Sequence, residues 1–133
     1  MNKIKILDGG MGTELIQHGE KLPHHTWSAH INLTNPELVC KIHKNYIKSG
    51  SDYIITNTFR TTPRAFKKTG LSIKQAYNNS KKSFDLAIES AKKASNKKIP
   101  ILGSIAPLED CYLPESFPGE KEASKEFEEI GEW

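Results

Sequence analysis

The stretch "IKILDGGMGTEL", residues 4–15, joins a short apolar run to a glycine-rich turn. The run Ile4–Leu7 is bounded by an acid and by glycines, which is typical of a buried strand that ends in a tight loop. Asp8 follows this run at once, and three glycines fall within the next four positions. Glycine leaves the backbone open to close approach. We therefore expect a strand over residues 4–7 and, after it, a loop where another group comes close to the main chain.

Two later apolar runs predict two more strands. Tyr53–Thr56 is β-branched and aromatic, and Ile99–Ile105 carries its proline near the start, where a strand tolerates it. We expect the residues directly after Tyr53–Thr56, "NTFRTTPRAF", to form a loop, and the polar stretch 17–34 to be an irregular connection.

Helical patterns separate these runs. The first helix begins at the cap Asn35 and ends at Gly50, and a second begins at a capping box made by Ser72 and Gln75. The "EASKEFEEIGEW" segment, residues 122–133, starts another helix. The second helix has an apolar stripe at helical spacing, formed by Ile73, Ala76, Tyr77, Phe84, Ala87, Ile88 and Ala91.

The alternation of strands and helices predicts an α/β fold with parallel strands. In such folds, ligands bind at the loops that leave the carboxyl ends of the strands, both in open sheets and in closed barrels. Those loops begin here at Asp8, Asn57 and Ser104.

Composition and charge narrow the class of protein. A chain of 133 residues with 36% hydrophobic and 26% charged residues fits one globular domain, residues 1–133. It has neither an apolar stretch of bilayer length nor a signal-peptide core, and its two cysteines lie far apart. We therefore expect a cytoplasmic protein with reduced thiols and no membrane partner.

The charge is distributed unevenly. Residues 1–114 carry 17 Lys and Arg against 9 Asp and Glu, whereas residues 115–133 carry 2 against 7. The lysines are scattered along helical patterns without interleaved aromatic residues, which favours a solvated face over a nucleic-acid groove. We therefore expect no nucleic-acid partner.

The glycine loop favours a zwitterionic ligand over a phosphate. It lacks the third glycine of a dinucleotide-binding turn and the Lys-Ser/Thr pair of a P-loop, and Asp8 would repel a pyrophosphate. A carboxylate beside open backbone can bind an ammonium while nearby N–H groups receive a carboxylate, which points to an amino acid. The alternative is that Asp8 and Thr13 only cap a short helix.

The segments "ILDGGMGTEL", "WSA", "NPELV", "IHKNYIKSGSDYIITNTF" and "GSIAP" occur in an order and spacing that resemble the homocysteine S-methyltransferase family. The resemblance covers nearly the whole chain. It implies a (β/α)8 TIM barrel, of which this chain supplies about the first three βα units, since a whole barrel takes about 250 residues. It also implies methyl transfer from an activated donor, such as S-methylmethionine or S-adenosylmethionine, to homocysteine.

The resemblance further implies a zinc ion that holds the homocysteine thiolate. The family's ligands are cysteines in the carboxyl-terminal half of the barrel, so we expect them beyond residue 133 and assign no metal ligand to this chain. Cys40 is expected in a helix core, and Cys111 matches no ligand motif. The histidines of the polar stretch lack a fixed ligand spacing and are expected at the surface: His18, His24, His25 and His30.

The family's substrate contacts carry over to eight positions, and the resemblance implies no catalytic residue among them. Asp8 matches the acid that contacts the amino acid group of homocysteine, and the others match the turn, the pocket wall and the polar strand ends: Gly9, Gly10, Met11, Trp27, Asn57, Thr58 and Ser104. For Asn57 and Thr58 the alternative is that they satisfy loop backbone. Arg60 is a weaker candidate for a donor carboxylate.

Three strands cannot close an eight-stranded barrel, so we expect this chain alone to be inactive and to expose the inward face of its strands. A second hypothesis is a non-catalytic module that binds a small amino-acid ligand or pairs with a separately encoded carboxyl-terminal half. A third is another α/β enzyme that uses Asp8 as a general base and needs no zinc.

Overall fold

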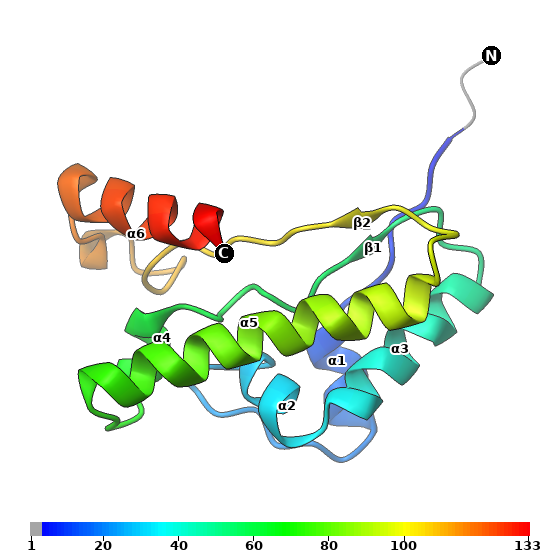
Figure 1. The fold of residues 1–133 in the computed structure, drawn as a ribbon, viewed down its shortest axis with the longest axis horizontal. Coiled ribbons are helices and arrows are strands. Elements are labelled where there is room, and N and C mark those ends of the chain that lie inside the picture. Colours follow the sequence, from blue (N-terminus) through cyan, green and yellow to red (C-terminus); the bar gives the residue numbers. More distant parts are fainter. Residues whose placement is uncertain (1–3) are drawn as a thin grey trace.

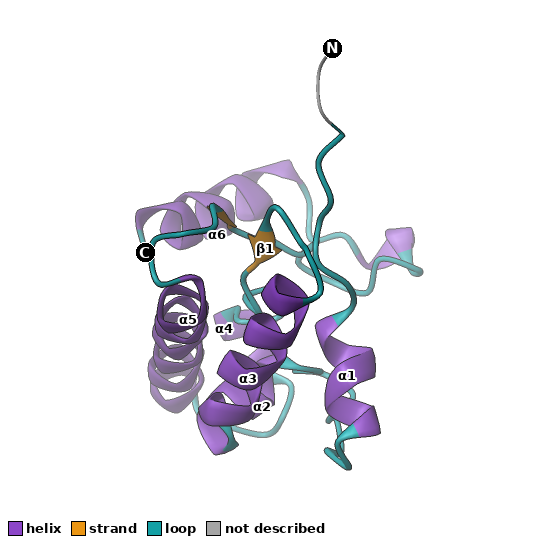
Figure 2. Cartoon of the chain, turned by 90° about the vertical axis from the view of Figure 1, so that its right-hand side faces the viewer, coloured by secondary structure: helices purple, strands orange, loops and turns teal. Residues whose placement is uncertain are grey.

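Strands and helices occupy two layers. The computed structural model describes residues 4–133. Figure 1 shows strands β1 and β2 along one side with helices α1 to α5 beneath them, and Figure 2 shows the same layering from one end. In chain order the elements are α1 (Met11–Gln17), α2 (Ala29–Thr34), α3 (Pro36–Lys48), β1 (Ile54–Ile55), α4 (Pro63–Lys67), α5 (Ile73–Ser95), β2 (Ile101–Leu102), the 3-10 helix η1 (Pro114–Ser116) and α6 (Glu120–Glu132).

The extended segments are parallel and follow one another in chain order. Leu7 forms a parallel bridge with Tyr53, and β1 pairs with β2 so that Ile54 lies opposite Ile101. The amide of Asp8 donates to the carbonyl of Tyr53 at 3.1 Å, which extends the first contact. The expected parallel α/β arrangement is therefore confirmed for these three segments.

The strands are much shorter than the sequence predicts. Each of β1 and β2 holds two residues, and the expected strand Ile4–Leu7 contributes one bridge only, at Leu7. Among residues 4–133 the first segment has a neighbour on one side alone, and Ile4 and Ile6 are 86% and 58% exposed. Ile6 does bond to the next segment, but irregularly: its carbonyl accepts from the amides of Asp52 and Tyr53, and its amide donates to the Asp52 carboxylate.

Helix α5 packs through small residues. Its buried positions are Ala76, Ser80, Ser83, Ala87, Ser90, Ala91 and Ser95. Helices α2, α3 and α4 contact α5, and short side chains let helix axes approach closely. The capping box at Ser72 and Gln75 is confirmed. The predicted apolar stripe is wrong at Ile73 and Tyr77, which are exposed, and the ring of Tyr77 instead meets that of Trp133 edge-on at 5.7 Å.

Two helices lie where loops were expected. Helix α4 begins after Thr62, whose hydroxyl accepts from Ala65 N at 3.1 Å, and Pro63 occupies its first position. Helix α2 has no side-chain cap, and its Ala29 and Ile31 are buried against neighbouring helices. Tertiary packing therefore stabilises α2, which local sequence signals cannot show.

The main apolar core lies between α1, α2 and α3. It consists of Leu15, Ile31, Val39 and Ile42, all at most 1% exposed, with Met11, Leu22, Leu38 and Tyr46 packed around them. Full burial of one such aliphatic side chain contributes about 1.5–3 kcal/mol. This core fixes the glycine loop at the start of α1 against the middle of α3.

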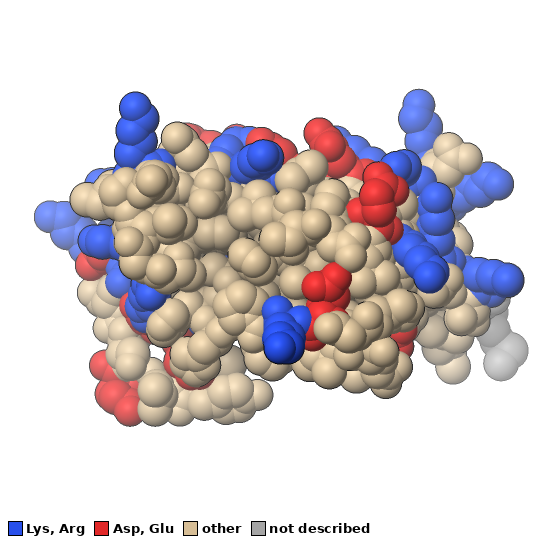
Figure 3. All heavy atoms as spheres, turned by 90° about the horizontal axis from the view of Figure 1, so that it is seen from below, with Lys and Arg blue, Asp and Glu red and all other residues tan. Residues whose placement is uncertain are grey.

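Apolar side chains stay exposed near the strands. Leu7, Leu102 and Ile105 are 52%, 41% and 57% exposed, whereas Ile54, next to α3 and α5, is fully buried. Seen from below, on the helix side, basic side chains are scattered around the margin and form no continuous stripe (Figure 3). Among residues 4–133, no helix combines the length and the apolar character that crossing a membrane demands.

Candidate functional site

The three loops that follow the parallel segments lie at one edge, as their common direction requires. The second and third loops are joined directly. The hydroxyl of Thr58 donates to the carbonyl of Ser104 at 2.6 Å, and the amide of Ser104 donates back to the same hydroxyl at 3.2 Å. Asp8, at the start of the first loop, bonds to Ile55 of β1, so residues far apart in the sequence meet near this edge.

The carboxylate of Asp8 is held by the neighbouring strand. Its Oδ2 accepts a hydrogen bond from Ile55 N at 2.9 Å, and only 3% of the side chain is exposed. Its Oδ1 is buried and has no hydrogen-bond partner among residues 4–133. The alternative that Asp8 and Thr13 cap a helix is wrong, because α1 has Gly10 as its N-cap and no side chain caps it. One carboxylate oxygen is thus left for another group.

Burial sets the charge states beside this carboxylate. Desolvation raises the pKa of Asp8, partly offset by hydrogen bonds from Ile55 N and from the residue's own N–H. Burial also lowers the pKa of His43 to about 4, so its imidazole is neutral at pH 7. Nδ1 of His43 lies 3.8 Å from Oδ2 of Asp8, which is a contact and not a hydrogen bond.

Aromatic rings occupy the space that two of the glycines leave open. A Cβ on Gly9 would lie 2.8 Å from the hydroxyl and ring of Tyr46, and one on Gly12 would lie 2.7 Å from the indole nitrogen of Trp27. The Tyr46 hydroxyl also donates to the carbonyl of Gly10 at 3.2 Å. The close approach that the sequence predicts is therefore made, at Gly9 and Gly12, by side chains of the protein itself.

Asn57 lies in a buried polar network that ties the end of β1 to α2. Its Oδ1 accepts from Ser28 Oγ at 2.6 Å, and its Nδ2 donates to Ser28 O at 3.0 Å and to Asn32 Oδ1 at 2.8 Å. Asn32 donates in turn to the carbonyl of Asn57 and to Ser83 of α5. The structure thus places the amide of Asn57 in the protein interior, where it fixes the loop.

The remaining predicted contacts are more open. Met11 begins α1 and is partly buried against the core, and Trp27 is 44% exposed with a positive φ of 48°. Such a backbone conformation is unfavourable for a bulky residue and is found at ligand sites and switch regions. The hydroxyl of Ser104 makes no hydrogen bond within residues 4–133. These side chains are free to contact a ligand.

The described residues do not assemble a metal centre. No group of three or more His, Cys, Asp or Glu residues in 4–133 is placed to hold a metal ion. Cys40 is buried in α3 as expected, and Cys111 is exposed. Arg60 lies over the ring of Phe59 at 5.9 Å.

Sequence reasoning missed two contributors on α3, His43 and Tyr46. Both sit one helical turn from core residues, His43 four positions after the buried Val39 and Tyr46 four after the buried Ile42. That spacing places both residues on the buried face of α3. A polar side chain on a buried helix face is the sequence signal that could have identified them.

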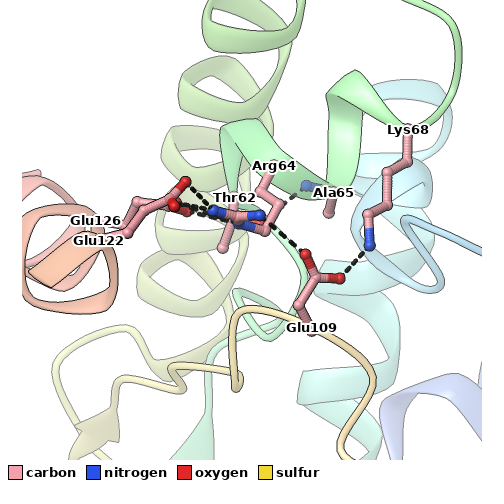
Figure 4. Close-up of polar contacts among 7 residues, drawn as sticks. All are labelled: Thr62, Arg64, Ala65, Lys68, Glu109, Glu122 and Glu126. Atoms are coloured by element: carbon pink, nitrogen blue, oxygen red, sulfur yellow. Dashed lines mark hydrogen bonds and ion pairs between the residues drawn. The ribbon is translucent and has the colours of Figure 1, made fainter. Parts of the chain in front are cut away.

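A second polar cluster, built on Arg64 of α4, docks α6 (Figure 4). Arg64 donates to Glu126 and Glu122 of α6 and to Glu109, which also accepts from Lys68. Hydrogen bonding to these carboxylates raises the pKa of Arg64 further, so it stays charged. The acidic excess of residues 115–133 is the sequence signal for this contact.

A hollow of about 630 Å³ lies beside α6 and the loop that follows β2. Its wall is mostly apolar and includes Ile105, Leu108, Leu113, Phe117 and Phe127. Glu109 and Cys111 also line the hollow. The loop that follows β2 therefore lines this hollow, whereas Asp8, Asn57, Thr58 and Ser104 are not among its lining residues.

Parallel segments in chain order, with an acid and free hydroxyl at their carboxyl edge, define an α/β protein of the kind that binds small ligands at that edge. The sequence profile of the family described as homocysteine S-methyltransferase matches residues 5–133. The chain belongs to this family.

Relatives and solved structures agree. The chain is 38% identical over 84 residues to Homocysteine S-methyltransferase 3 of Arabidopsis thaliana, covering 63% of this chain and 24% of that protein. It is 32% identical over 108 residues to Homocysteine S-methyltransferase 2 of the same plant, covering 81% and 31%. The metallated form of the homocysteine methyltransferase MmuM from Escherichia coli superposes with a TM-score of 0.69 at 28% identity, over 92% of this chain and 46% of that one. The chain thus spans less than half the length of these proteins.

Proposed function

We propose that this chain supplies the amino-acid end of the substrate site in a cytoplasmic homocysteine S-methyltransferase of the (β/α)8 barrel type. The observation that carries the proposal is the carboxylate of Asp8, whose Oδ1 is buried and unpartnered within residues 4–133 at the ligand-binding edge of the fold. A buried carboxylate oxygen without a partner is costly, by about 1–3 kcal/mol or more. The ammonium of an amino acid is the partner that its charge favours.

The neighbouring groups suit the rest of such a substrate. The hydroxyl of Ser104 can bind a polar group, while Met11 and Trp27 offer apolar surface to a thioalkyl chain. Asn57 and Thr58 act in the proposal by holding their loops, Asn57 through Ser28 and Thr58 through Ser104. The carboxylate of Asp8 is nearly closed to solvent, so binding requires its side chain or the glycine loop to move.

The family resemblance implies a zinc ion, but the residues described here do not fit one. Among residues 4–133, neither a cysteine pair nor any group of three potential ligands is gathered. We therefore derive no step of the reaction through a metal from this chain. Its own residues bind and orient the amino acid group, which fixes where the sulfur lies relative to the donor.

The proposed reaction is a direct transfer. The thiol of homocysteine first loses its proton to solvent, and the resulting thiolate attacks the methyl carbon of a sulfonium donor such as S-methylmethionine or S-adenosylmethionine, whose sulfur keeps the bonding pair and leaves as a neutral thioether. The bond from that carbon to the donor breaks, the new carbon–sulfur bond forms, and methionine results. Positioning of the two reactants is what the protein contributes, and no residue of this chain forms a covalent bond.

The test is methionine formation by this chain expressed together with the coding sequence downstream of it. We expect formation of labelled methionine from homocysteine and a methyl-labelled donor, and loss of that activity when a zinc chelator is added. Full methyl transfer in the presence of the chelator would overturn the metal assignment and favour the alternative in which Asp8 is a general base.

A second candidate is a non-catalytic module that pairs with a separately encoded carboxyl-terminal half. The exposed side chains Leu7, Leu102 and Ile105 and the apolar hollow favour it, because a partner would cover them. A neighbouring reading frame with the family's Gly-Gly-Cys-Cys stretch would support a split enzyme. Without such a frame, amino-acid binding with no methyl transfer would be the expected behaviour.

A further inference from the structure

The buried imidazole of His43 is a feature that the proposed function does not yet use. His43 is fully buried in α3, and neither of its ring nitrogens has a hydrogen-bond partner within residues 4–133. A leucine at this position would satisfy the packing of α3 without burying two polar atoms. An unpartnered buried donor or acceptor costs about 1–3 kcal/mol, so packing alone does not account for a histidine here.

The nearest ion-pairing group to this imidazole is the carboxylate of Asp8, with Nδ1 at 3.8 Å from Oδ2. A movement of about 1 Å would bring the two atoms to ordinary hydrogen-bond distance. Asp8 has the matching need, since Oδ1 has no partner in the described chain and Oδ2, which accepts from Ile55 N, lies within reach of the ring. The imidazole therefore lacks an acceptor for its N–H at a point where the carboxylate of Asp8 can accept a further hydrogen bond.

The charge state of the imidazole decides what it can do. Because burial keeps the pKa of His43 low, at about 4, the ring is neutral at pH 7 and offers one N–H. A neutral donor can orient the carboxylate without cancelling its negative charge, which an ammonium ligand needs. Tyr46 and Glu14 are the other titratable groups near this place. The pKa of Tyr46 is raised mainly by burial, and in smaller part by the negative charges of Glu14 and Asp8.

We propose that His43 is a positioning residue for Asp8, donating its Nδ1–H to Oδ2 so that Oδ1 is presented to the ammonium of the bound amino acid. The inference rests on the proposed function, because it assigns the ligand group that Oδ1 receives. His43 touches no substrate atom in this arrangement and acts through the carboxylate.

The test compares His43→Leu, which cannot donate, with His43→Gln, which can, by calorimetric titration of the chain with homocysteine. We expect His43→Leu to weaken binding by about 3- to 10-fold, the equivalent of one hydrogen bond, while its stability to urea at pH 7 is unchanged or higher. His43→Gln should restore affinity to within about 3-fold. Wild-type affinity in His43→Leu, or loss of affinity only in step with loss of stability, would overturn the proposal.

A second measurement separates this proposal from the proposed function. Nitrogen-15 NMR of the imidazole in the free chain at pH 7 should show a neutral ring protonated on Nδ1, and the carboxyl carbon signal of Asp8 should shift in His43→Leu. A ring protonated on Nε2 with an unchanged Asp8 signal would overturn the positioning role. Failure of the wild-type chain to bind homocysteine, with the Nδ1-protonated ring present, would overturn the proposed function instead.

Discussion

Individual residues around the glycine loop are fixed by close contacts with aromatic rings. Tyr46 lies against Gly9, and the indole of Trp27 lies against Gly12. The sequence predicts that something approaches this backbone, but it cannot say which group, because both rings come from segments separated from the loop in the chain. The positions of the loop backbone and of the two rings are therefore coupled, and Trp27 belongs to the proposed pocket wall.

Substitution of Gly12 by alanine should displace Trp27. Its new Cβ would lie 2.7 Å from the indole nitrogen, a distance that requires the ring or the loop to move. We expect a loss of about 1–3 kcal/mol in the free energy of unfolding and a changed tryptophan fluorescence spectrum. Gly103→Ala is the matched control, since nothing lies within 4 Å of its Cβ. Equal stability of the two variants would refute the contact.

The buried imidazole of His43 should make stability depend on pH. The unfolded chain protonates this residue near pH 6.5 and the folded chain only near pH 4, so the unfolded state binds more protons between these values. As the pH falls through this window, the wild type should lose up to about 3 kcal/mol relative to His43→Leu. The raised pKa of Asp8 makes stability depend on pH in the opposite direction. It stabilises the folded state below the unfolded pKa of Asp8, and this stabilisation is lost as the pH rises.

Urea unfolding of both proteins from pH 7 to pH 4 measures this difference. Asp8 is present in both proteins, so most of its contribution cancels in the comparison, and His24→Leu serves as a control at an exposed histidine. Stability curves of the wild type and His43→Leu that stay parallel across the window would show that His43 is not buried as a neutral group.

At the scale of elements, the structure joins the acidic helix α6 to α4 through the carboxylates around Arg64. Arg64→Gln should lower the free energy for local opening of α6 by about 1–3 kcal/mol, because its charged hydrogen bonds to Glu122 and Glu126 of this helix are lost. Amide hydrogen exchange along Glu120–Glu132 measures this opening, and the effect should shrink at high salt.

Lys93→Gln is the control for that experiment. Lys93 pairs with Glu37, but both side chains are more than half exposed, so solvent screens the pair and it contributes little to stability. If exchange in α6 is as slow in Arg64→Gln as in Lys93→Gln, the cluster does not hold the helix.

Elements with local signals could be predicted from the sequence, and elements without them could not. Asn35 and Ser72 cap α3 and α5 as expected, because a side-chain cap depends on residues within one turn. Helix α2 was missed because its Ala29 and Ile31 are stabilised by burial against distant helices. Strand lengths were overestimated because they depend on neighbouring strands, which an apolar run does not reveal.

The same distinction applies to the site. Asp8 could be located from its place after an apolar run, and the parallel arrangement explains why Thr58 meets Ser104. The inward turn of Asn57 into a network with Ser28 could not be read from the sequence, because its partners lie 29 and 25 residues away. The spacing of His43 after Val39 indicates the buried face of α3, but only the structure shows that its ring nitrogens lack a hydrogen-bond partner within residues 4–133.

At the scale of the whole molecule, the chain leaves an apolar surface uncovered near the strands. We expect it to associate with a second copy as its concentration rises, because Leu7, Leu102 and Ile105 are about half exposed. Ile105→Lys should weaken this association at least several-fold, while Ile73→Lys, at an exposed site on α5, should not. Sedimentation velocity over a range of concentrations gives the result, and a wild type that stays monomeric throughout would contradict the expectation.

The central claim is that Asp8 binds the ammonium of homocysteine. Calorimetric titration of the wild type and Asp8→Asn with homocysteine and with 4-mercaptobutyrate, which lacks the amino group, tests it most directly. Asparagine can still accept from Ile55 N but carries no charge. We predict that the wild type prefers homocysteine by about 10-fold or more and that Asp8→Asn loses this preference. An unchanged preference for homocysteine in Asp8→Asn would contradict the account.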